Sequence, residues 1–330
     1  MTDKPFASVS LDADNLWAYQ MTHGDPGWEN YPTYLDALAD QVLPLLGEQG
    51  LTITFFVVGM DAARKENEEA IAAMAAAGHE IGNHSYRHQP WLHRYTLEEI
   101  HTELRNAEDA IESVTGIRPV GFRGPGYSLS PDVVRVLIDR GYEYDCSTLP
   151  TVIGPLARRY YFRSAKLTPQ QQAERSYLFG RASDGLRSIK PYEWDLGGDR
   201  LLELPVTTMP LVRVPIHLSY VLYLAAVSPA AADRYFSWSL HLCRLRQVNP
   251  SILLHPLDFL GADDVDGLRF FPGMDMPGEK KRAIVRRCLD EMARQFDIVT
   301  MRQHAERAKQ GEPLRTRPAR SLAIESEVVA

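Results

Sequence analysis

The chain alternates segments typical of buried strands with segments typical of amphipathic helices, and this alternation limits the folds open to it. Residues 51–58 are rich in β-branched and aromatic side chains, which favours a buried strand. The preceding helix, expected over residues 34–49, ends at a glycine, and the helix over residues 96–115 begins with a capping box formed by Thr96 and Glu99. Because strand and helix keep alternating, the sequence predicts a mainly parallel sheet covered by helices, either open or closed as a barrel. The other expected strands are 7–12, 80–83, 120–123, 142–145, 201–206, 251–254 and 298–300, and the other expected helices are 66–77, 130–140, 278–295 and 302–309.

Length and composition indicate one main domain with insertions. The chain has 330 residues, of which 45% are hydrophobic and 24% charged, and no linker rich in Gly, Ser or Pro divides it. We expect the domain to span residues 1–310 and to include a basic, aromatic insertion at 151–190 and apolar helices at 211–248. Residues 311–330 carry two prolines and scattered charges, and we expect this tail to lack a fixed structure. Residues 16–34, with many aromatic and turn-forming side chains, are expected to form a long ordered loop.

Charge, cysteine use and hydropathy exclude several classes of protein. The net charge of −7 gives no global attraction to nucleic acid. The three cysteines, Cys146, Cys243 and Cys288, are far apart in the chain, which argues against a disulfide framework and against a thiolate zinc site. The first residues lack the apolar core of a signal peptide, and the most apolar run, 216–227, is shorter than the about 20 residues that cross a bilayer. We therefore expect a cytoplasmic protein.

Ionisable side chains gather directly after the expected strands. Asp12 and Asp14 end the first strand and point the same way, because side chains alternate along a strand; a paired-carboxylate site and a turn rich in Asx residues both explain them. His84 and His88 are four residues apart, so on a helical turn both imidazoles would face one point, which a metal ion or merely solvent would occupy. In parallel α/β folds, functional groups collect at the carboxyl ends of strands, which favours the metal. The segment from Arg123 to Tyr127, Asp145 and His255 also follow strand ends.

These residue types suit metal-assisted hydrolysis. Two histidines and one carboxylate are enough to hold Zn²⁺ with a position open for water. The ion lowers the pKa of that water and polarises a carbonyl group. A second carboxylate can then act as general base, and His255 suits protonation of a leaving amine.

Four short segments, in the same order along the chain, resemble the polysaccharide deacetylases of carbohydrate esterase family four. They are SLDADN at 10–15, HSYRH at 84–88, RGPGYS at 123–128 and LLHP at 253–256. The resemblance implies a distorted (β/α) barrel of the type found in that family, and a metal-dependent carbohydrate N-deacetylase.

The resemblance also implies a role for each matching residue. Asp12 matches the catalytic base, and His255 matches the general acid. Arg123 looks like the arginine that orients the base, and the backbone N–H near Tyr127 looks like a donor to the oxyanion. The metal ligands would be Asp14, His84 and His88, with Zn²⁺ as the expected ion and Co²⁺, Mn²⁺ or Ni²⁺ as alternatives.

The resemblance also implies that Leu253 or Leu254 would line the pocket for the acetyl methyl group. Two further residues are candidates of lower rank. Asp145 and Glu203 are two more carboxylates at or near strand ends.

The sequence departs from the common pattern of the family at Ala13, which separates two aspartates that are adjacent in many members. This resembles an Asp-x-Asp branch that includes intracellular and non-polysaccharide amidases, and it argues against a polymeric cell-wall substrate. We expect hydrolysis of an N-acyl group, foremost N-acetyl, on an amino sugar. A cyclic amidase or deformylase with the same site, and a carbohydrate-binding protein without activity, are the alternatives.

The two insertions bear on what carries the amino sugar. Arginine suits phosphate, and apolar helices suit a membrane interface, so a lipid-linked or nucleotide-linked sugar and a peripheral membrane contact are both hypotheses. A solvated loop at 151–190 and a core or homo-oligomer contact at 211–248 are the alternatives. The basic residues of the first insertion are Arg158, Arg159, Arg163, Lys166, Arg175, Arg181, Arg187 and Lys190.

Overall fold

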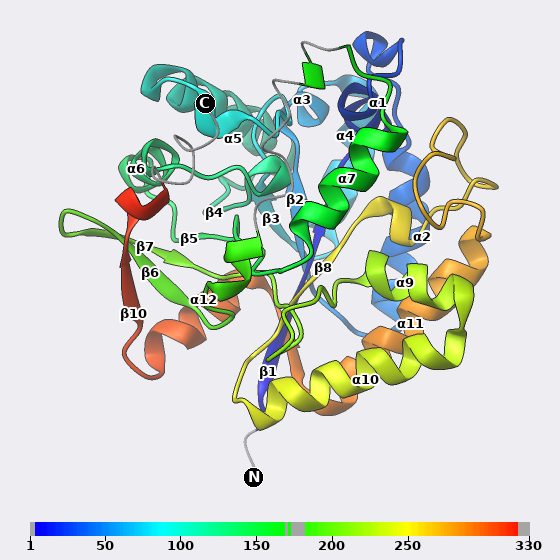
Figure 1. Ribbon diagram of the computed structural model, residues 1–330. Coiled ribbons are helices and arrows are strands. Elements are labelled where there is room, and N and C mark those ends of the chain that lie inside the picture. Colours follow the sequence, from blue (N-terminus) through cyan, green and yellow to red (C-terminus); the bar gives the residue numbers. More distant parts are fainter. Residues whose placement is uncertain (1–3, 169–170, 173–181, 323–330) are drawn as a thin grey trace.

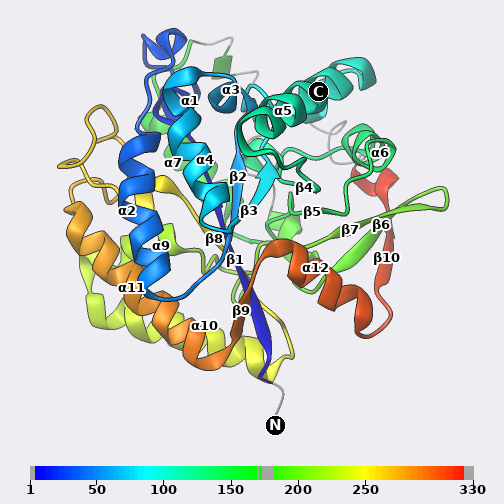
Figure 2. The same cartoon turned by 180° about the vertical axis from the view of Figure 1, so that it is seen from behind.

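The computed structural model describes residues 4–168, 171–172 and 182–322. A ten-stranded sheet runs through the middle of the molecule, with helices on both sides of it (Figures 1 and 2). All of its ladders are parallel except the one between β6 and β7. The fold is therefore of the α/β class that the alternation predicted. In spatial order the strands are β10 (Arg315–Pro318), β6 (Tyr192–Leu196), β7 (Asp199–Glu203), β5 (Tyr144–Asp145), β4 (Gly121–Phe122), β3 (Glu80–Asn83), β2 (Thr54–Val57), β1 (Phe6–Asp12) and β8 (Ser251–Leu254), and β9 (Asp297–Val299) also pairs with β1.

The helices begin and end where local sequence signals place them. The Thr96 side chain caps the start of α5 in the predicted capping box with Glu99, and Gly116 ends that helix with a φ of 69°. Among the described residues the α-helices are α1 (Leu16–His23), α2 (Leu35–Glu48), α3 (Gly59–Ala62), α4 (Glu68–Ala76), α5 (Leu97–Thr115), α6 (Pro131–Asp139), α7 (Gly154–Ser164), α9 (Leu218–Val227), α10 (Pro229–Leu245), α11 (Gly278–Gln295) and α12 (Met301–Gln310). None of them combines the length and the apolar content that a bilayer crossing would need.

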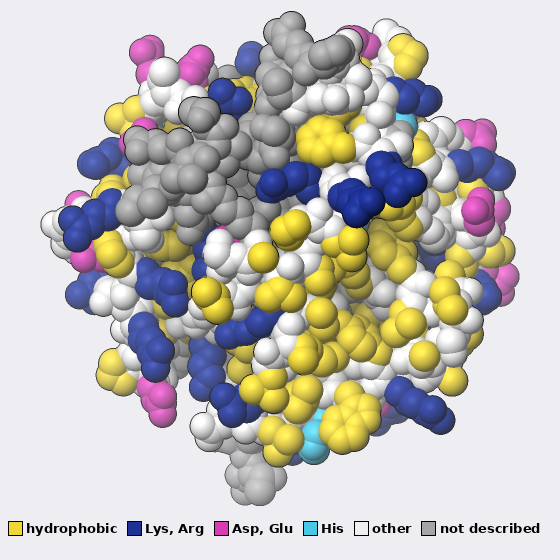
Figure 3. Space-filling view, in the orientation of Figure 1, with side chains coloured by type: hydrophobic (Ala, Val, Ile, Leu, Met, Phe, Trp, Pro, Cys, Tyr) yellow, Lys and Arg dark blue, Asp and Glu magenta, His cyan; other side chains and the backbone are white. Residues whose placement is uncertain are grey.

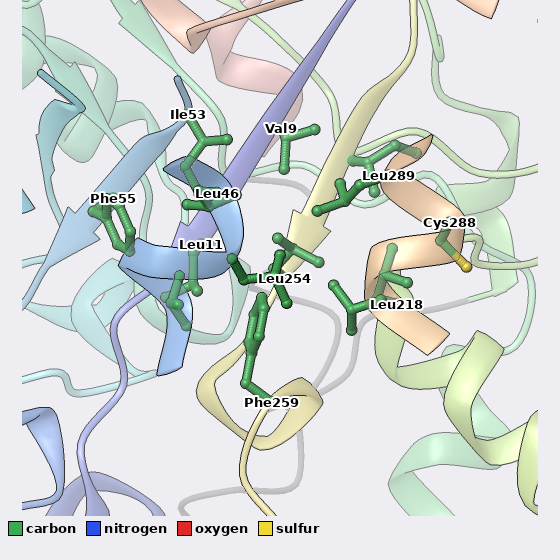
Figure 4. Close-up of a cluster of buried hydrophobic side chains, with 14 of the residues drawn as sticks. Val9, Leu11, Leu46, Ile53, Phe55, Leu218, Leu254, Phe259, Cys288 and Leu289 are labelled. Atoms are coloured by element: carbon green, nitrogen blue, oxygen red, sulfur yellow. The ribbon is translucent and has the colours of Figure 1, made fainter. Parts of the chain in front are cut away.

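Strand β1 lies inside the main hydrophobic core. It pairs with β8 along one edge and with β2 and β9 along the other, and its Val9 and Leu11 are fully buried. Around them pack Leu46 of α2, Leu254 of β8 and Leu289 of α11 (Figure 4). Because β1 is held on both edges and by packing, the residues at its carboxyl end start from a rigid base.

The prediction that residues 311–330 lack a fixed structure is wrong for residues 315–322. Strand β10 extends the sheet by pairing in parallel with β6, and a short 3₁₀ turn follows it. Ala319 and Leu322 are buried in a cluster with Trp194 and Leu201. The sequence of this segment suggested disorder because it is charged and only a few apolar side chains anchor it. Residues 323–330 lie outside the described part of the chain.

Three other expectations need correction. Residues 16–34 contain helix α1 and a 3₁₀ turn rather than one long loop. The apolar segment at 211–248 is helical only from Leu218, since residues 211–217 form a loop with a bridge between Thr208 and Pro215. The sequence predicted strand β7 of the hairpin formed by β6 and β7, but not strand β6. In the basic insertion, residues 174, 175 and 181 lie outside the described residues, and α7 is its main described element.

Candidate active site and metal centre

The ionisable residues singled out in the sequence lie at one edge of the sheet because their strands are in register. Strands β1 and β8 pair up to their last residues, so Asp12, which ends β1, and His255, which follows β8, leave the sheet side by side. Strands β3 and β4 pair in the same way, and His84 and Arg123 follow them as neighbours. Four segments distant in the chain thus place polar groups at one point, as parallel α/β sheets do.

The turn that carries the two histidines is not helical, so the predicted helical turn is wrong. Ser85 and His88 have φ values of 63° and 52°, in the left-handed region that these residue types rarely adopt. The Asn83 carboxamide oxygen accepts from the Ser85 N–H at 2.7 Å, and the Ser85 hydroxyl accepts from the His88 N–H at 3.1 Å. The imidazoles still converge, but two left-handed residues and these side-chain bonds bring them together.

Asp14, His84 and His88 form a cluster whose geometry fits a metal ion. Nε2 of His84 lies 3.2 Å from Oδ1 of Asp14, and Nε2 of His88 lies 2.9 Å from the same oxygen. All three side chains are buried, and their ligand atoms lie within 4.8 Å of one another. Despite these short distances, Oδ1 of Asp14 and Nε2 of His88 have no hydrogen-bond partner. Buried polar atoms rarely stay unpaired, and two that lie together beside the His84 imidazole are what a cation site presents.

Hydrogen bonds and charge prepare this cluster for a cation. Nδ1 of His84 lies 2.6 Å from the Arg123 carbonyl oxygen, which can only accept, so Nδ1 carries the proton and Nε2 keeps its lone pair for a metal. Burial would raise the pKa of Asp14, but its interactions with the neighbouring His88 and His84 imidazoles outweigh burial and hold that pKa well below its usual range. The donor set is therefore one carboxylate and two imidazoles.

Asp12 lies beside this cluster and is held by Arg123. Nη1 of Arg123 donates to Oδ1 of Asp12 at 2.6 Å and to the Ser10 hydroxyl at 2.9 Å. The guanidinium is fully buried over the Phe56 ring, 4.4 Å from its centroid. Burial opposes its charge, but Asp12 outweighs this and raises the Arg123 pKa, so the guanidinium keeps its charge. Oδ2 of Asp12 lies 3.9 Å from Nε2 of His84 and is left to face the cluster.

His255 is oriented by side chains that sequence reasoning missed. Its Nδ1 lies 3.3 Å from the Ser219 hydroxyl, and its backbone N–H donates to Asp258 at 2.8 Å. The His217 ring lies 6.0 Å away, centroid to centroid, and its Nδ1 has no hydrogen-bond partner. Burial, with smaller effects from the charges of His255 and Arg123, lowers the His217 pKa to about 3, so this imidazole is neutral. A histidine and a serine inside the apolar run at 216–227 were the available signal.

Two expected roles do not agree with the geometry. The Tyr127 N–H, expected as an oxyanion donor, donates to the Gly124 carbonyl oxygen at 2.9 Å and is not free for that role. Of the two leucines expected to line an acetyl pocket, neither is among the residues that line the cavity described below. Both are fully buried, and Leu254 packs in the main core (Figure 4).

Asp145 and Glu203 do not line the cavity described below, but they accept hydrogen bonds from residues that do. They pair across β5 and β7, and burial raises the pKa of both, so the pair retains a proton. Asp145 accepts from the Ser147 hydroxyl at 2.5 Å, and that hydroxyl accepts from the Gly124 N–H at 2.8 Å. Glu203 accepts from the Thr148 hydroxyl at 2.6 Å. The two carboxyl groups thus brace the turn that follows Arg123.

A cavity of about 1630 Å³ opens over these residues. Its floor is formed by Asp12, Asp14, His84, His88 and His255, and Tyr127, His217 and Ser219 also line it. Its outer walls come from α7, from α9 and from the loop that contains Phe270 and Phe271. The residues that the sequence analysis assigned to metal and acid–base roles are therefore brought together and are open to a ligand.

Residues 25–144 match the sequence profile of the polysaccharide deacetylase family. This stretch includes His84, His88 and Arg123 and excludes Asp12, Asp14 and His255. Over 89 residues, 27% of the chain, the sequence is 34% identical to the peptidoglycan-N-acetylmuramic acid deacetylase PdaC of Bacillus subtilis, of which it covers 18%. The chain spans less than half the length of the curated relatives it matches.

Two solved structures resemble the whole chain. A Mycobacterium smegmatis protein assigned to the polysaccharide deacetylases has a TM-score of 0.60 and 22% identity, with 96% of both chains covered. Puue allantoinase has a TM-score of 0.55 and 17% identity, with 93% of this chain and 91% of the other covered. At these identities the likeness concerns the fold alone, and it confirms the distorted (β/α) barrel that the sequence predicted.

Proposed function

Because residues 25–144 match the polysaccharide deacetylase family, we propose that this chain belongs to that family and is a hydrolase that removes an N-acyl group, foremost N-acetyl, from an amino sugar with the help of a divalent metal ion. The observation that carries the proposal is the convergence of Asp14, His84 and His88 on one point beside Asp12, at the floor of an open cavity. The relationship to a deacetylase of N-acetylmuramic acid supports an N-acetylated sugar as substrate.

The metal would be held by Asp14, His84 and His88. One carboxylate and two imidazoles suit Zn²⁺ first and Co²⁺, Mn²⁺ or Ni²⁺ as alternatives. When bound, the ion supplies a polarising charge for the substrate carbonyl and makes a nearby water more acidic.

The protein's own residues then handle the protons. Asp12 accepts a proton from the attacking water through the oxygen that Arg123 does not occupy. Arg123 fixes the orientation of Asp12 by donating to its other oxygen. His255, whose ring is held by the Ser219 hydroxyl, donates a proton to the nitrogen that leaves as the amine.

Tyr127 has a role through its side chain in this proposal. Burial, reinforced by the charge of Asp12, raises the pKa of its phenol, which therefore keeps its proton. Since Tyr127 lines the cavity, the hydroxyl can donate a hydrogen bond to the substrate. This differs from the expected donation by its backbone amide.

The test is acetate release from a panel of N-acetylated sugars by the purified protein, before and after removal of metal by a chelator. We expect release that stops with the chelator and returns on addition of Zn²⁺ or Co²⁺. Formamides and cyclic ureides belong in the same panel, because hydrolysis of these alone would replace the proposal with a deformylase or cyclic amidase. Sugar binding without any hydrolysis would indicate a carbohydrate-binding protein. The cytoplasmic location expected from the sequence stays a prediction.

A further inference from the structure

Exposed hydrophobic side chains are concentrated on one part of the molecule. Among the described residues, eleven large hydrophobic side chains are exposed, and nine of them lie between residues 152 and 245. Figure 3 shows hydrophobic side chains gathered on the face formed by α7, α9 and α10. Six of these residues surround the start of α7 and are called the apolar rim: Val152, Leu156, Tyr160, Leu186, Leu211 and Val212.

The apolar rim is one surface, although three segments contribute to it. The Val152 N–H donates to the Arg213 carbonyl oxygen at 3.1 Å, which places the 211–213 loop against the segment leading into α7. A Cβ on Gly185 would lie 2.4 Å from a Val152 methyl group, which places the turn before Leu186 against the same residue. The fold therefore brings exposed apolar side chains together from three separate segments of the chain, one of which is helix α7.

The 211–213 loop keeps its apolar residues outside at a conformational cost. Leu211 has a φ of 77° and is 67% exposed, and Arg213 has a φ of 58°. A leucine in the left-handed region is strained, and such strain tends to persist at functional sites. Burial does not account for it, because the Leu211 side chain points to the outside.

Basic side chains lie where the apolar rim meets the cavity. Arg158, Arg159 and Arg163 of α7 and Arg187 all line the cavity, in a protein whose net charge is −7. Figure 3 shows Lys and Arg side chains beside the hydrophobic ones on this face. Arginine is the side chain best suited to bind phosphate oxygens.

The cavity is larger and more apolar than an amino sugar requires. Its volume of about 1630 Å³ exceeds the roughly 300–1,000 Å³ of sites that hold drug-sized ligands. Ile153, Leu156 and Tyr160 form one outer wall, and Phe270 and Phe271 form another. Phe270 is stacked on the His23 ring at 3.6 Å and Phe271 meets the Tyr19 ring edge-on, so these walls are held in place.

We propose that the amino sugar is presented on a lipid, through a phosphate or diphosphate, and that the apolar rim rests on the membrane surface. This inference rests on the proposed function. The arginines of α7 contact the phosphate, and the first part of the lipid chain lies between α7 and the Phe270–Phe271 loop. A nucleotide carrier accounts for the arginines and the aromatic rings but not for the four residues of the apolar rim that do not line the cavity, Val152, Leu186, Leu211 and Val212. A second copy of the chain accounts for the apolar rim but not for the arginines inside the cavity.

The first test measures binding to membranes without any catalysis. The protein is floated with vesicles of phosphatidylcholine and phosphatidylglycerol, as wild type and as the Leu156→Glu/Leu211→Glu double variant. Leu97→Glu is the matched control, because Leu97 is an exposed leucine on α5, which lies in front in Figure 2 while α7 lies behind. We expect the wild type and Leu97→Glu to float and the double variant to lose at least about ten-fold in binding.

The second test measures substrate preference. Acetate release is compared between an N-acetylated amino sugar on a long-chain polyprenyl phosphate or diphosphate and the same sugar on a nucleotide. We expect the lipid-linked substrate to have the lower KM, and the double variant to lose that advantage while Leu97→Glu keeps it.

Several outcomes overturn the inference, and they differ from failure of the proposed function. No flotation of the wild type, or a preference for the nucleotide-linked sugar, removes the lipid. A dimer in solution that the double variant splits assigns the apolar rim to a second copy. If no sugar of any kind releases acetate, the proposed function fails, while the flotation result still decides whether the rim binds a membrane.

Discussion

The floor and the apolar rim of the same cavity differ in polarity and in the kind of element that carries their residues. The floor, made of Asp12, Asp14, His84, His88 and His255, is polar and at the ends of paired strands. The apolar rim is exposed and comes from a helix and two loops. Reactions need fixed distances, which a rigid sheet provides, whereas the choice of substrate is set by the loops around it. Substitutions on the floor should therefore change the reaction, and substitutions on the rim should change which substrate reaches it.

The largest effect is expected from Asp14→Asn. The amide keeps the size of the side chain and loses the charge that faces His84 and His88. We expect the protein to lose its metal in elemental analysis and its acetate release to fall by about a thousand-fold or more, because the whole contribution of the ion is removed. A variant that still binds one equivalent of metal with normal activity would contradict the ligand assignment.

Asp12→Asn should distinguish the role of Asp12 from that of Asp14. It removes the proposed base while leaving all three ligands, so metal content should stay at the wild-type value and turnover should fall by about 10²- to 10⁴-fold. The comparison with Asp14→Asn is direct, because the two residues are two positions apart in the same segment. Loss of metal in both variants would mean that Asp12 is a ligand and that the floor needs another base.

Much of the floor could be predicted from the sequence because each residue follows a recognisable strand. Asp12, His84, Arg123 and His255 come directly after runs of β-branched or apolar residues, and parallel strands place such positions together. The His84 to His88 turn shows where this reasoning ends. Spacing predicted the convergence, but the left-handed backbone at Ser85 depends on a bond from Asn83, which no periodicity reveals.

The rim and the second layer of the site could not be predicted, because their contacts join segments distant in the chain. Ser219 meets His255, and Val152 meets Arg213, across 36 and 61 positions, and no motif marks Ser219, Val152 or Arg213. The sequence alone does not show that the Tyr127 N–H already donates to the Gly124 carbonyl oxygen. β10 was missed for the same reason, since its partner β6 lies more than a hundred residues earlier.

A smaller effect is expected from Ser219→Ala. The hydroxyl lies 3.3 Å from Nδ1 of His255, so its loss frees the ring of the proposed general acid without removing it. We expect turnover to fall by about ten-fold with little change in KM, because second-layer partners of this kind are typically worth 10- to 100-fold. Ser237→Ala on α10 is the matched control, and equal losses in the two variants would count against an orienting role.

The smallest effect concerns the pH dependence of stability. It involves the buried side chain of His217 rather than an exposed residue of the apolar rim. Burial lowers the His217 pKa to about 3 from the ordinary 6.5, so the folded protein holds the neutral form while the unfolded chain takes up a proton below about pH 6.5. The stability contributed by His217 is thus complete above pH 6.5 and is lost as the pH falls towards 3. Each such proton gives a slope of at most about 1.4 kcal/mol per pH unit.

His217→Gln should make the free energy of unfolding depend less on pH between pH 6 and pH 4, as measured by denaturant titration at several pH values. Leu211→Glu, which changes an exposed rim position, should leave the His217 contribution in place, and an unchanged slope in His217→Gln would show that His217 is not held neutral by burial in the folded protein.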